Sequence, residues 1–277
     1  MPPSCRRRAR SLTDVVRARR ANLRRAVVSA IVAVVLISPA SSRAETSATL
    51  NVALTPEHLG RGTTIEFGFD LVGPAGSVPQ PVRTISLFYP RHVGVLTSGL
   101  GQASCTTGML EARGPPGCPS RSLMGFGTAT GAIQVGDERV DEQALTSVYL
   151  APFQNGEIAL LFFLDAYTPL FTERIFNGVL QSAPPPFGGA LTIDVPAIEG
   201  FAEGPDVALV KLRSTIGPLG ITYYEHVHGH FVPYQPSGIV LPLHCPKGGF
   251  PFAARFTFAD GHRLTATRKV RCPRSRG

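Results

Sequence analysis

Apolar and polar residues alternate with a period of two along much of the chain beyond residue 45. Short apolar stretches are separated by turns rich in glycine and proline, and no long stretch has helical periodicity. This pattern predicts an all-β protein. We expect strands at residues 48–55, 63–72, 82–90, 122–133 and around 144–164.

A first hairpin is predicted at residues 145–164, LTSVYLAPFQNGEIALLFFL. Its Asn155-Gly156 dipeptide is typical of a two-residue type I′ turn, because both residues tolerate the positive φ angles that this turn requires. Such a loop would place Tyr149 opposite Phe162. Both faces of the hairpin are apolar, so we expect it to lie at the centre of the fold.

A second hairpin is predicted at residues 250–270, FPFAARFTFADGHRLTATRKV. A two-residue loop at 260–261 would mix core and solvent side chains on each face. A three-residue loop at 259–261 pairs Phe256 with Leu264 and keeps the two faces distinct. Since a slip of one residue moves every side chain to the other face, we expect the three-residue loop.

Four of the five cysteines lie beyond residue 44, and none forms a C-x-x-C pair that would favour a zinc site. An even number of cysteines in an exported protein indicates disulfides. The register of the second hairpin places Cys272 opposite Gly248, near Cys245, so we pair Cys245 with Cys272. Cys105 and Cys118 then close a loop of about fourteen residues, which stabilises the fold by ~3 kcal/mol in the chain-entropy model.

The formal charge of +8 and the pI near 9.7 would suggest a nucleic-acid partner if they described the whole chain. However, residues 1–44 hold ten arginines and one acidic residue. The remainder holds 17 basic and 18 acidic residues, so its net charge is −1. We therefore expect no nucleic-acid partner.

Residues 1–44 have the layout of a secretory signal peptide, with an arginine-rich start and the apolar stretch AVVSAIVAVVLISPA at 26–40. Ser42 and Ala44 occupy the small-residue positions before a cleavage site. As a helix the apolar stretch spans about 22 Å, less than the ~30 Å of a bilayer core. We expect a secreted or cell-envelope protein cleaved after Ala44. The alternative is an uncleaved segment that anchors the protein to the membrane.

Four stretches resemble uncharacterised exported proteins of actinobacteria: ISLFYPRHVGVLTSGLGQASC at 85–105, ARGPPGCPSRSLMGFGTA at 112–129, STIGPLGITYY at 214–224 and CPKGGFPFAARFTFADG at 245–261. The resemblance covers most of residues 46–273. It implies an immunoglobulin-like or related β-sandwich and brings no known activity.

We expect two packed sandwich units after the signal peptide of residues 1–44. The first unit spans residues 45–143 and the second spans residues 144–277. The alternative is one large sandwich, 45–277, because the first hairpin could belong to a shared core.

Three histidines are separated by single residues in YYEHVHGHFVPY, 223–234. On a continuous strand His226, His228 and His230 share a face, and a three-residue loop at 227–229 would instead place His226 opposite His230. Either geometry brings two imidazoles together as zinc or copper ligands, with His244 or His262 as a further ligand. No carboxylate partner for the imidazoles is evident. We therefore favour solvated histidines and expect no metal cofactor.

Two charged stretches are also expected to be exposed to solvent without a binding role. GDERVDEQ, 136–143, lacks the ligand spacing of a calcium loop, although it offers the carboxylates of Asp137, Glu138, Asp141 and Glu142. RKVRCPRSRG, 268–277, carries a basic group made up of Arg268, Lys269, Arg271, Arg274 and Arg276.

The sequence contains no G-x-S-x-G motif and no spare cysteine once two disulfides form, so nucleophilic catalysis is not expected. The favoured hypothesis is a non-enzymatic, exported structural or adhesive protein with an unknown cell-surface or extracellular partner. The alternative is a secreted metal-binding protein or metal-dependent enzyme that uses the histidine cluster.

Overall fold

The computed structural model describes residues 45–94, 99–169, 171–200 and 204–272. Strands dominate these residues and the helices are short, so the all-β prediction is confirmed. Ala44–Gly277 forms one compact unit, called the body below. The predicted signal peptide lies outside the described residues.

The strands closely follow the predicted ranges at the start of the chain. They are β1 Ser47–Thr55, β2 Gly62–Val72, β3 Val82–Pro90, β4 Leu123–Val135, β5 Glu138–Leu150, β6 Ala159–Thr168, β7 Thr172–Ser182, β8 Phe187–Asp194, β9 Ala208–Ile216, β10 Tyr223–Val227, β11 His230–Tyr234, β12 Ile239–Val240, β13 Phe250–Phe258 and β14 Arg263–Val270. The helical elements are η2 Pro74–Gly76, α2 Thr107–Arg113, η3 Pro115–Gly117 and η4 Ser120–Ser122.

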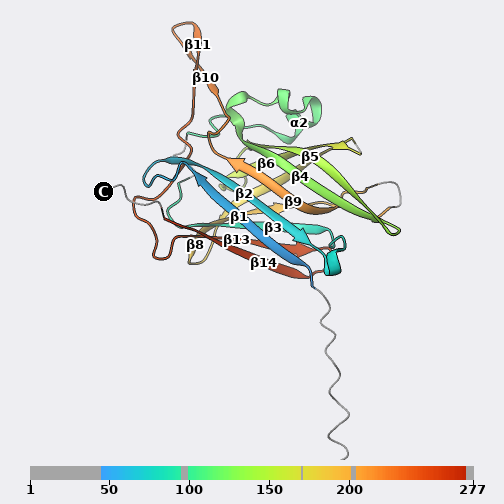
Figure 1. The fold of residues 1–277 in the computed structure, drawn as a ribbon. Coiled ribbons are helices and arrows are strands. Elements are labelled where there is room, and N and C mark those ends of the chain that lie inside the picture. The colour runs from blue at the N-terminus through green and yellow to red at the C-terminus, as the bar shows by residue number, and fades with distance from the viewer. Residues whose placement is uncertain (1–44, 95–98, 170, 201–203, 273–277) are drawn as a thin grey trace, which may run out of the picture. The chain divides into compact units, whose positions relative to one another are not determined.

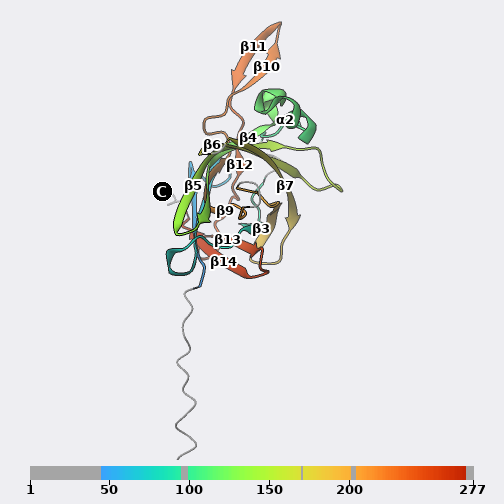
Figure 2. The same cartoon turned by 90° about the vertical axis from the view of Figure 1, so that its right-hand side faces the viewer.

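Twelve of the described strands form one continuous antiparallel sheet (Figure 1). Eleven follow the order β1-β2-β9-β4-β5-β6-β7-β8-β3-β13-β14, and β12 adds a short pairing to β2. The remaining pair, β10 and β11, forms a separate hairpin that projects from the body in both Figure 1 and Figure 2.

The large sheet curves until its two edge strands, β1 and β14, lie side by side. In Figure 2, β5 and β7 lie on opposite sides of the interior and β13 lies below it. Alternate side chains of the strands of this sheet therefore point into one core. Phe69 on β2 and Phe256 on β13, both fully buried, meet across it with ring centroids 4.9 Å apart. Burying side chains of this size stabilises the fold by about 2–3 kcal/mol each.

The first predicted hairpin is central, as expected from its two apolar faces. Phe162 on β6 packs against the main core. On the opposite face, Leu161 and Phe163 pack under the segment between Cys105 and Cys118, together with Leu110 of α2. The outer face of this hairpin is apolar because the segment between Cys105 and Cys118, from a different part of the chain, packs over it.

The predicted turn of this hairpin is correct, but the predicted register is wrong. Asn155 and Gly156 have φ angles of 52° and 82°, as a type I′ turn requires. Yet Tyr149 lies opposite Leu161 instead of Phe162. Pro152 supplies no amide donor, and the chain between β5 and the turn contains one more residue than the facing chain. This bulge shifts the pairing by one position.

The second hairpin has the predicted register. Phe256 lies opposite Leu264, and Gly261 has the left-handed φ of 81° expected for the last residue of the three-residue loop. The amide of Phe258 donates to the carbonyl oxygen of His262 at 2.9 Å and closes the ladder.

The expected boundary between residues 143 and 144 falls inside β5. This strand pairs along its length with β4 on one side and, from Gln143 onward, with β6 on the other. The pairing with β4 therefore continues through this position in regular register, while the pairing with β6 has a bulge between Gln143 and Ala144 and resumes beyond it.

Candidate functional site

The curved sheet surrounds a cavity of about 160 Å³. Its wall is formed by inward-facing side chains from most strands of the sheet, among them Phe67, Leu87, Phe162, Phe176, Leu191 and Phe252. Among the described residues, no charged side chain lines it. Protein interiors rarely contain voids larger than a water molecule, so a cavity of this size is an unusual feature of a core.

The inner face of β4 explains part of this space. Gly125, Gly127 and Ala129 are every second residue of the strand, and their register partners on β5 and β9 point inward. Because these three residues carry little or no side chain, the wall is thin where β4 crosses the interior.

Two aliphatic hydroxyl groups, besides the phenol of Tyr89, interrupt the apolar wall. Thr146 on β5 and Ser214 on β9 both lie opposite Gly127, one on each side of β4. Both residues line the cavity, and neither hydroxyl oxygen has a hydrogen-bond partner among the described residues. A buried hydroxyl without a partner costs about 1–3 kcal/mol, so two of them in one cavity wall call for an explanation.

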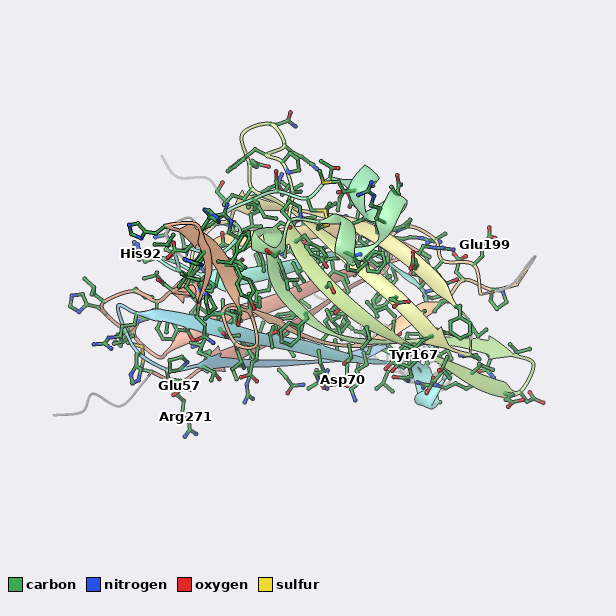
Figure 3. All side chains as sticks on the ribbon, turned by 90° about the horizontal axis from the view of Figure 1, so that it is seen from above. Glu57, Asp70, His92, Tyr167, Glu199 and Arg271 are labelled. Atoms are coloured by element: carbon green, nitrogen blue, oxygen red, sulfur yellow. A yellow bond between two sulfur atoms is a disulfide. The ribbon has the colours of Figure 1, made fainter. Side chains whose placement is uncertain are left out.

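A second cavity of about 60 Å³ adjoins the first. Ala129, Leu164, Ile198 and Leu209 line both cavities. The second cavity also has two acidic residues, Glu142 and Glu199, in its lining. Glu142 accepts a hydrogen bond from the backbone amide of Thr168 at 3.1 Å. Figure 3 places Glu199 toward the end of the body away from His92.

Of the described residues that line the larger cavity, one carries a titratable group. Burial raises the pKa of Tyr89 above the ordinary tyrosine value, so its phenol is neutral at physiological pH. The larger cavity therefore presents no charge to a bound molecule, whereas the smaller one presents carboxyl groups.

The structure does not bring the three histidines of the β10–β11 hairpin together. His228 and Gly229 have φ angles of 47° and 84° and form a two-residue turn, so both predicted geometries, the continuous strand and the three-residue loop, are wrong. His226 lies opposite Phe231 and His230 opposite Val227. Directly opposite residues share a face, so the imidazoles of His226 and His230 lie on opposite faces of the hairpin.

The other candidate ligands are also dispersed. His226 contacts the ring of Phe231 at a centroid distance of 5.2 Å, and His262 stacks on Phe258 at 6.0 Å. His244 is exposed to solvent. Within the described parts of the chain, no group of three or more His, Cys, Asp or Glu side chains is arranged to hold a metal ion.

The acidic stretch 136–143 forms the turn between β4 and β5 and the start of β5. Asp137 lies in the turn, and Asp141 pairs with Arg139 at 2.7 Å. Glu138 is exposed, while Glu142 reaches the smaller cavity. In the basic stretch, Arg268, Lys269 and Arg271 are exposed. Arg274 and Arg276 lie outside the described residues.

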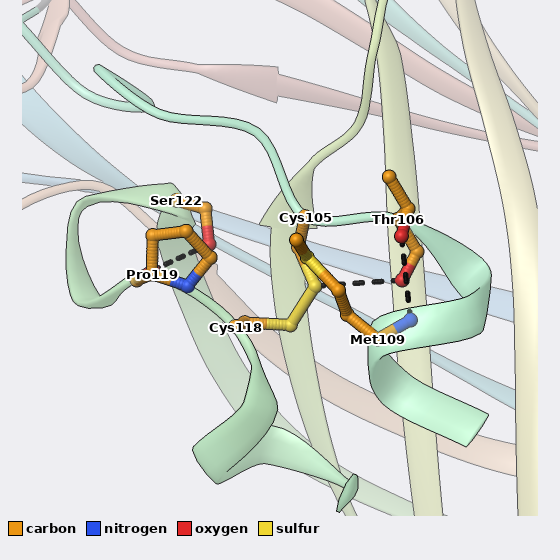
Figure 4. The surroundings of a disulfide bond; sticks show 6 residues. All are labelled: Cys105, Thr106, Met109, Cys118, Pro119 and Ser122. Atoms are coloured by element: carbon orange, nitrogen blue, oxygen red, sulfur yellow. Dashed lines mark hydrogen bonds between the residues drawn. A yellow bond between two sulfur atoms is a disulfide. The ribbon is translucent and has the colours of Figure 1, made fainter. Parts of the chain in front are cut away.

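Both predicted disulfides are present, Cys105–Cys118 and Cys245–Cys272. Figure 4 shows the first beside the start of α2, where the Thr106 hydroxyl accepts a hydrogen bond from the Met109 amide at 3.3 Å. The Cys105 amide donates to Leu150 at 2.8 Å, which attaches the clipped segment to the end of β5. The second disulfide joins the end of β14 to the chain before β13.

No family model, curated protein or solved structure matches this chain. In the described part of the chain, none of the helices has the length and apolar character needed to cross a membrane. The interior cavity is the feature that analysis of the sequence missed. The sequence feature that indicates the cavity is the spacing of small residues in MGFGTATG, 124–131. Gly125, Gly127 and Ala129 occupy the inward positions of this stretch.

Proposed function

We propose that this chain is an exported, non-enzymatic protein whose curved sheet holds a small, mostly hydrocarbon ligand. The observation that carries the proposal is the uncharged cavity of about 160 Å³ inside the sheet. A sheet that closes on itself can hold one small ligand in its interior. The sequence favoured an exported structural or adhesive protein without a specific activity. The activity proposed here is the binding of a small hydrocarbon ligand.

The size of the cavity indicates the size of the ligand. An apolar cavity of about 150 Å³ stays dry and binds benzene or xenon in another protein. At ~24 cal/mol per Å³, leaving such a volume unfilled costs about 4 kcal/mol of stability. A ligand of one aromatic ring or a short alkyl chain would recover part of this free energy. We therefore expect ligand binding to raise the temperature of unfolding.

Benzene is a suitable first probe because it has no polar group. Full-length protein is expressed in an exporting bacterial host, purified, and titrated with benzene while thermal unfolding is followed. We expect a saturable rise in unfolding temperature. Absence of any saturable effect, for benzene and for the larger ring compounds used below, would show that the cavity does not bind ligands of this class.

A pair of variants tests whether binding occurs in the cavity. Ala129→Leu adds three carbon atoms at a position that lines both cavities. Ala53→Leu makes the same change at an exposed position of β1. We expect Ala129→Leu to abolish the benzene effect and Ala53→Leu to retain it. Equal binding by both variants would place the probe elsewhere.

The export part of the proposal rests on the signal-like residues 1–44 and on two disulfides, which form in oxidising compartments. Mass spectrometry of protein from the culture medium should give an N-terminus at Glu45. Recovery of the intact segment in a membrane fraction would replace this part with the anchor alternative.

A further inference from the structure

We propose that the ligand carries one uncharged hydrogen-bonding group, seated against Thr146 and Ser214. This inference rests on the proposed function, since it concerns the same cavity. Thr146 is 7% exposed, and the hydroxyl oxygens of both residues are buried without a hydrogen-bond partner among the described residues. Both residues line the larger cavity.

The hydroxyls of Thr146 and Ser214 lie on either side of Gly127 and belong to the same part of the cavity wall. In an antiparallel sheet, directly opposite residues point to the same face. Thr146 and Ser214 are both opposite Gly127, so the two hydroxyls flank a strand that has no side chain between them. A polar group of the ligand can therefore approach both hydroxyls over the bare backbone of β4.

This pair lies close to the junction of the two cavities. Ala129, the next inward residue of β4 after Gly127, lines both of them. The hydrocarbon part of the ligand would fill the larger cavity, with its polar group at the two hydroxyls beside the junction.

The charges around the cavities argue for an uncharged group. In the described lining of the larger cavity there is no arginine, lysine or histidine that could neutralise a carboxylate or phosphate. Nor is there one in the described lining of the smaller cavity, which offers instead the acidic residues Glu142 and Glu199. Burying an unpaired charge is strongly unfavourable. Hydroxyl groups both donate and accept hydrogen bonds, which suits an alcohol, an ester or an amide.

Three probes of similar size separate these possibilities. Ethylbenzene and benzyl alcohol have the same number of non-hydrogen atoms and differ by the replacement of a methyl group with a hydroxyl group, and benzoate carries a charge. Their dissociation constants are measured by calorimetry for the full protein and for Thr146→Val and Ser214→Ala. Ser147→Ala, the next residue on β5 with its side chain on the outer face, is the matched control.

We expect each cavity variant to raise the ratio of the benzyl alcohol to the ethylbenzene dissociation constant about tenfold, because it removes a hydrogen-bonding partner of the alcohol. The control should leave the ratio unchanged. Both cavity variants should unfold at or above the temperature of the unsubstituted protein, since each removes a buried hydroxyl without a partner. Benzoate should bind at least tenfold more weakly than benzyl alcohol.

Failure of this inference is distinct from failure of the proposed function. If ethylbenzene and benzyl alcohol both bind and the ratio is the same in all variants, the hydroxyls bind water only and the inference is wrong while the proposed function stands. Tighter binding of benzoate would also overturn it. If none of the probes binds, the proposed function and the inference both fail.

Discussion

The phenolic oxygen of Tyr223 lies 2.5 Å from the backbone carbonyl oxygen of Leu123, one hundred residues earlier in the chain. Tyr223 donates this hydrogen bond and accepts another from the backbone amide of Gly101 at 3.1 Å. Its side chain is fully buried. One phenol thus joins the base of the β10–β11 hairpin to the start of β4 and to the loop that precedes α2.

Substitution of Tyr223 by phenylalanine should destabilise the body. Tyr223→Phe leaves the Gly101 amide and the Leu123 carbonyl without this partner, so we expect the free energy of unfolding to fall by about 1–3 kcal/mol. Urea denaturation measures the change. Tyr224→Phe is the control, because Tyr224 is 50% exposed and its substitution should change stability by less than ~0.5 kcal/mol. Equal effects of the two substitutions would contradict the assigned role.

The buried tyrosines make stability depend on alkaline pH. Burial raises the pKa of Tyr89, Tyr149 and Tyr223 above the ordinary value of 10.0. For Tyr149 a hydrogen bond with Ser147 opposes this rise in part. The unfolded chain therefore loses protons at a lower pH than the folded chain. The contribution of these phenols to the free energy of unfolding is fully present below pH 10. It is lost as the pH rises through their folded-state pKa values.

Absorbance of tyrosinate near 295 nm measures this titration. In folded protein we expect part of the tyrosine signal to appear only at a pH above the ordinary range, together with loss of the β-sheet circular dichroism. Tyr223→Phe should reduce the amplitude of this late phase. A single titration of all tyrosines at their ordinary pKa, with the fold intact, would show that the three phenols are accessible to solvent.

The two hairpins show what the sequence can predict about register. Phe256 pairs with Leu264 as predicted, because only one loop length separates core from solvent side chains there. In the first hairpin both faces of β6 are apolar, so a slip of one residue replaces one set of apolar side chains in the core with another and the pattern does not report it. The bulge near Pro152 was therefore invisible in the alternation, although the Asn155-Gly156 turn was predictable from its dipeptide.

The cavity and the histidines illustrate a different limit. Gly127 and Thr146 lie on the consecutive strands β4 and β5, but Ser214 lies on β9, which is distant in the chain. Their shared row therefore depends on the pairing of β9 with β4, which local patterns do not encode. The separation of His226 from His230 depends on a turn of two residues instead of three. The loop length decides which imidazoles share a face.

Two glycine substitutions should have opposite effects. At Gly125 an added Cβ would overlap the backbone carbonyl oxygen of Thr215, so Gly125→Ala requires β4 and β9 to move apart. We expect a loss of about 1–3 kcal/mol, typical of overpacking. Gly108, in α2, has no atom within 4 Å of an added Cβ, and Gly108→Ala should stabilise by up to ~1 kcal/mol through helix propensity. Chemical denaturation of both variants measures these changes, and destabilisation by Gly108→Ala would contradict the account.

The body should unfold in one cooperative transition. Since β5 pairs with β4 and β6 across residues 143 and 144, neither part can lose its strands without exposing the other. We expect far-UV circular dichroism and tyrosine fluorescence to give coincident urea transitions. Limited proteolysis should degrade the body without a stable intermediate. A stable fragment that ends near Asp137–Glu142 would instead support two separate units.

Zinc should not be held by the histidines of the β10–β11 hairpin. His226 and Phe231 share one face of this hairpin and His230 and Val227 share the other, so the two imidazoles cannot bind one ion without breaking the strand pairing. Protein purified without a histidine tag should contain well below one equivalent of zinc or copper by elemental analysis. Addition of zinc or EDTA should leave its unfolding temperature unchanged, and His226→Ala and His230→Ala should behave like the unsubstituted protein. About one equivalent of metal that disappears in both variants would show that the hairpin rearranges around an ion and would revive the metal-binding hypothesis.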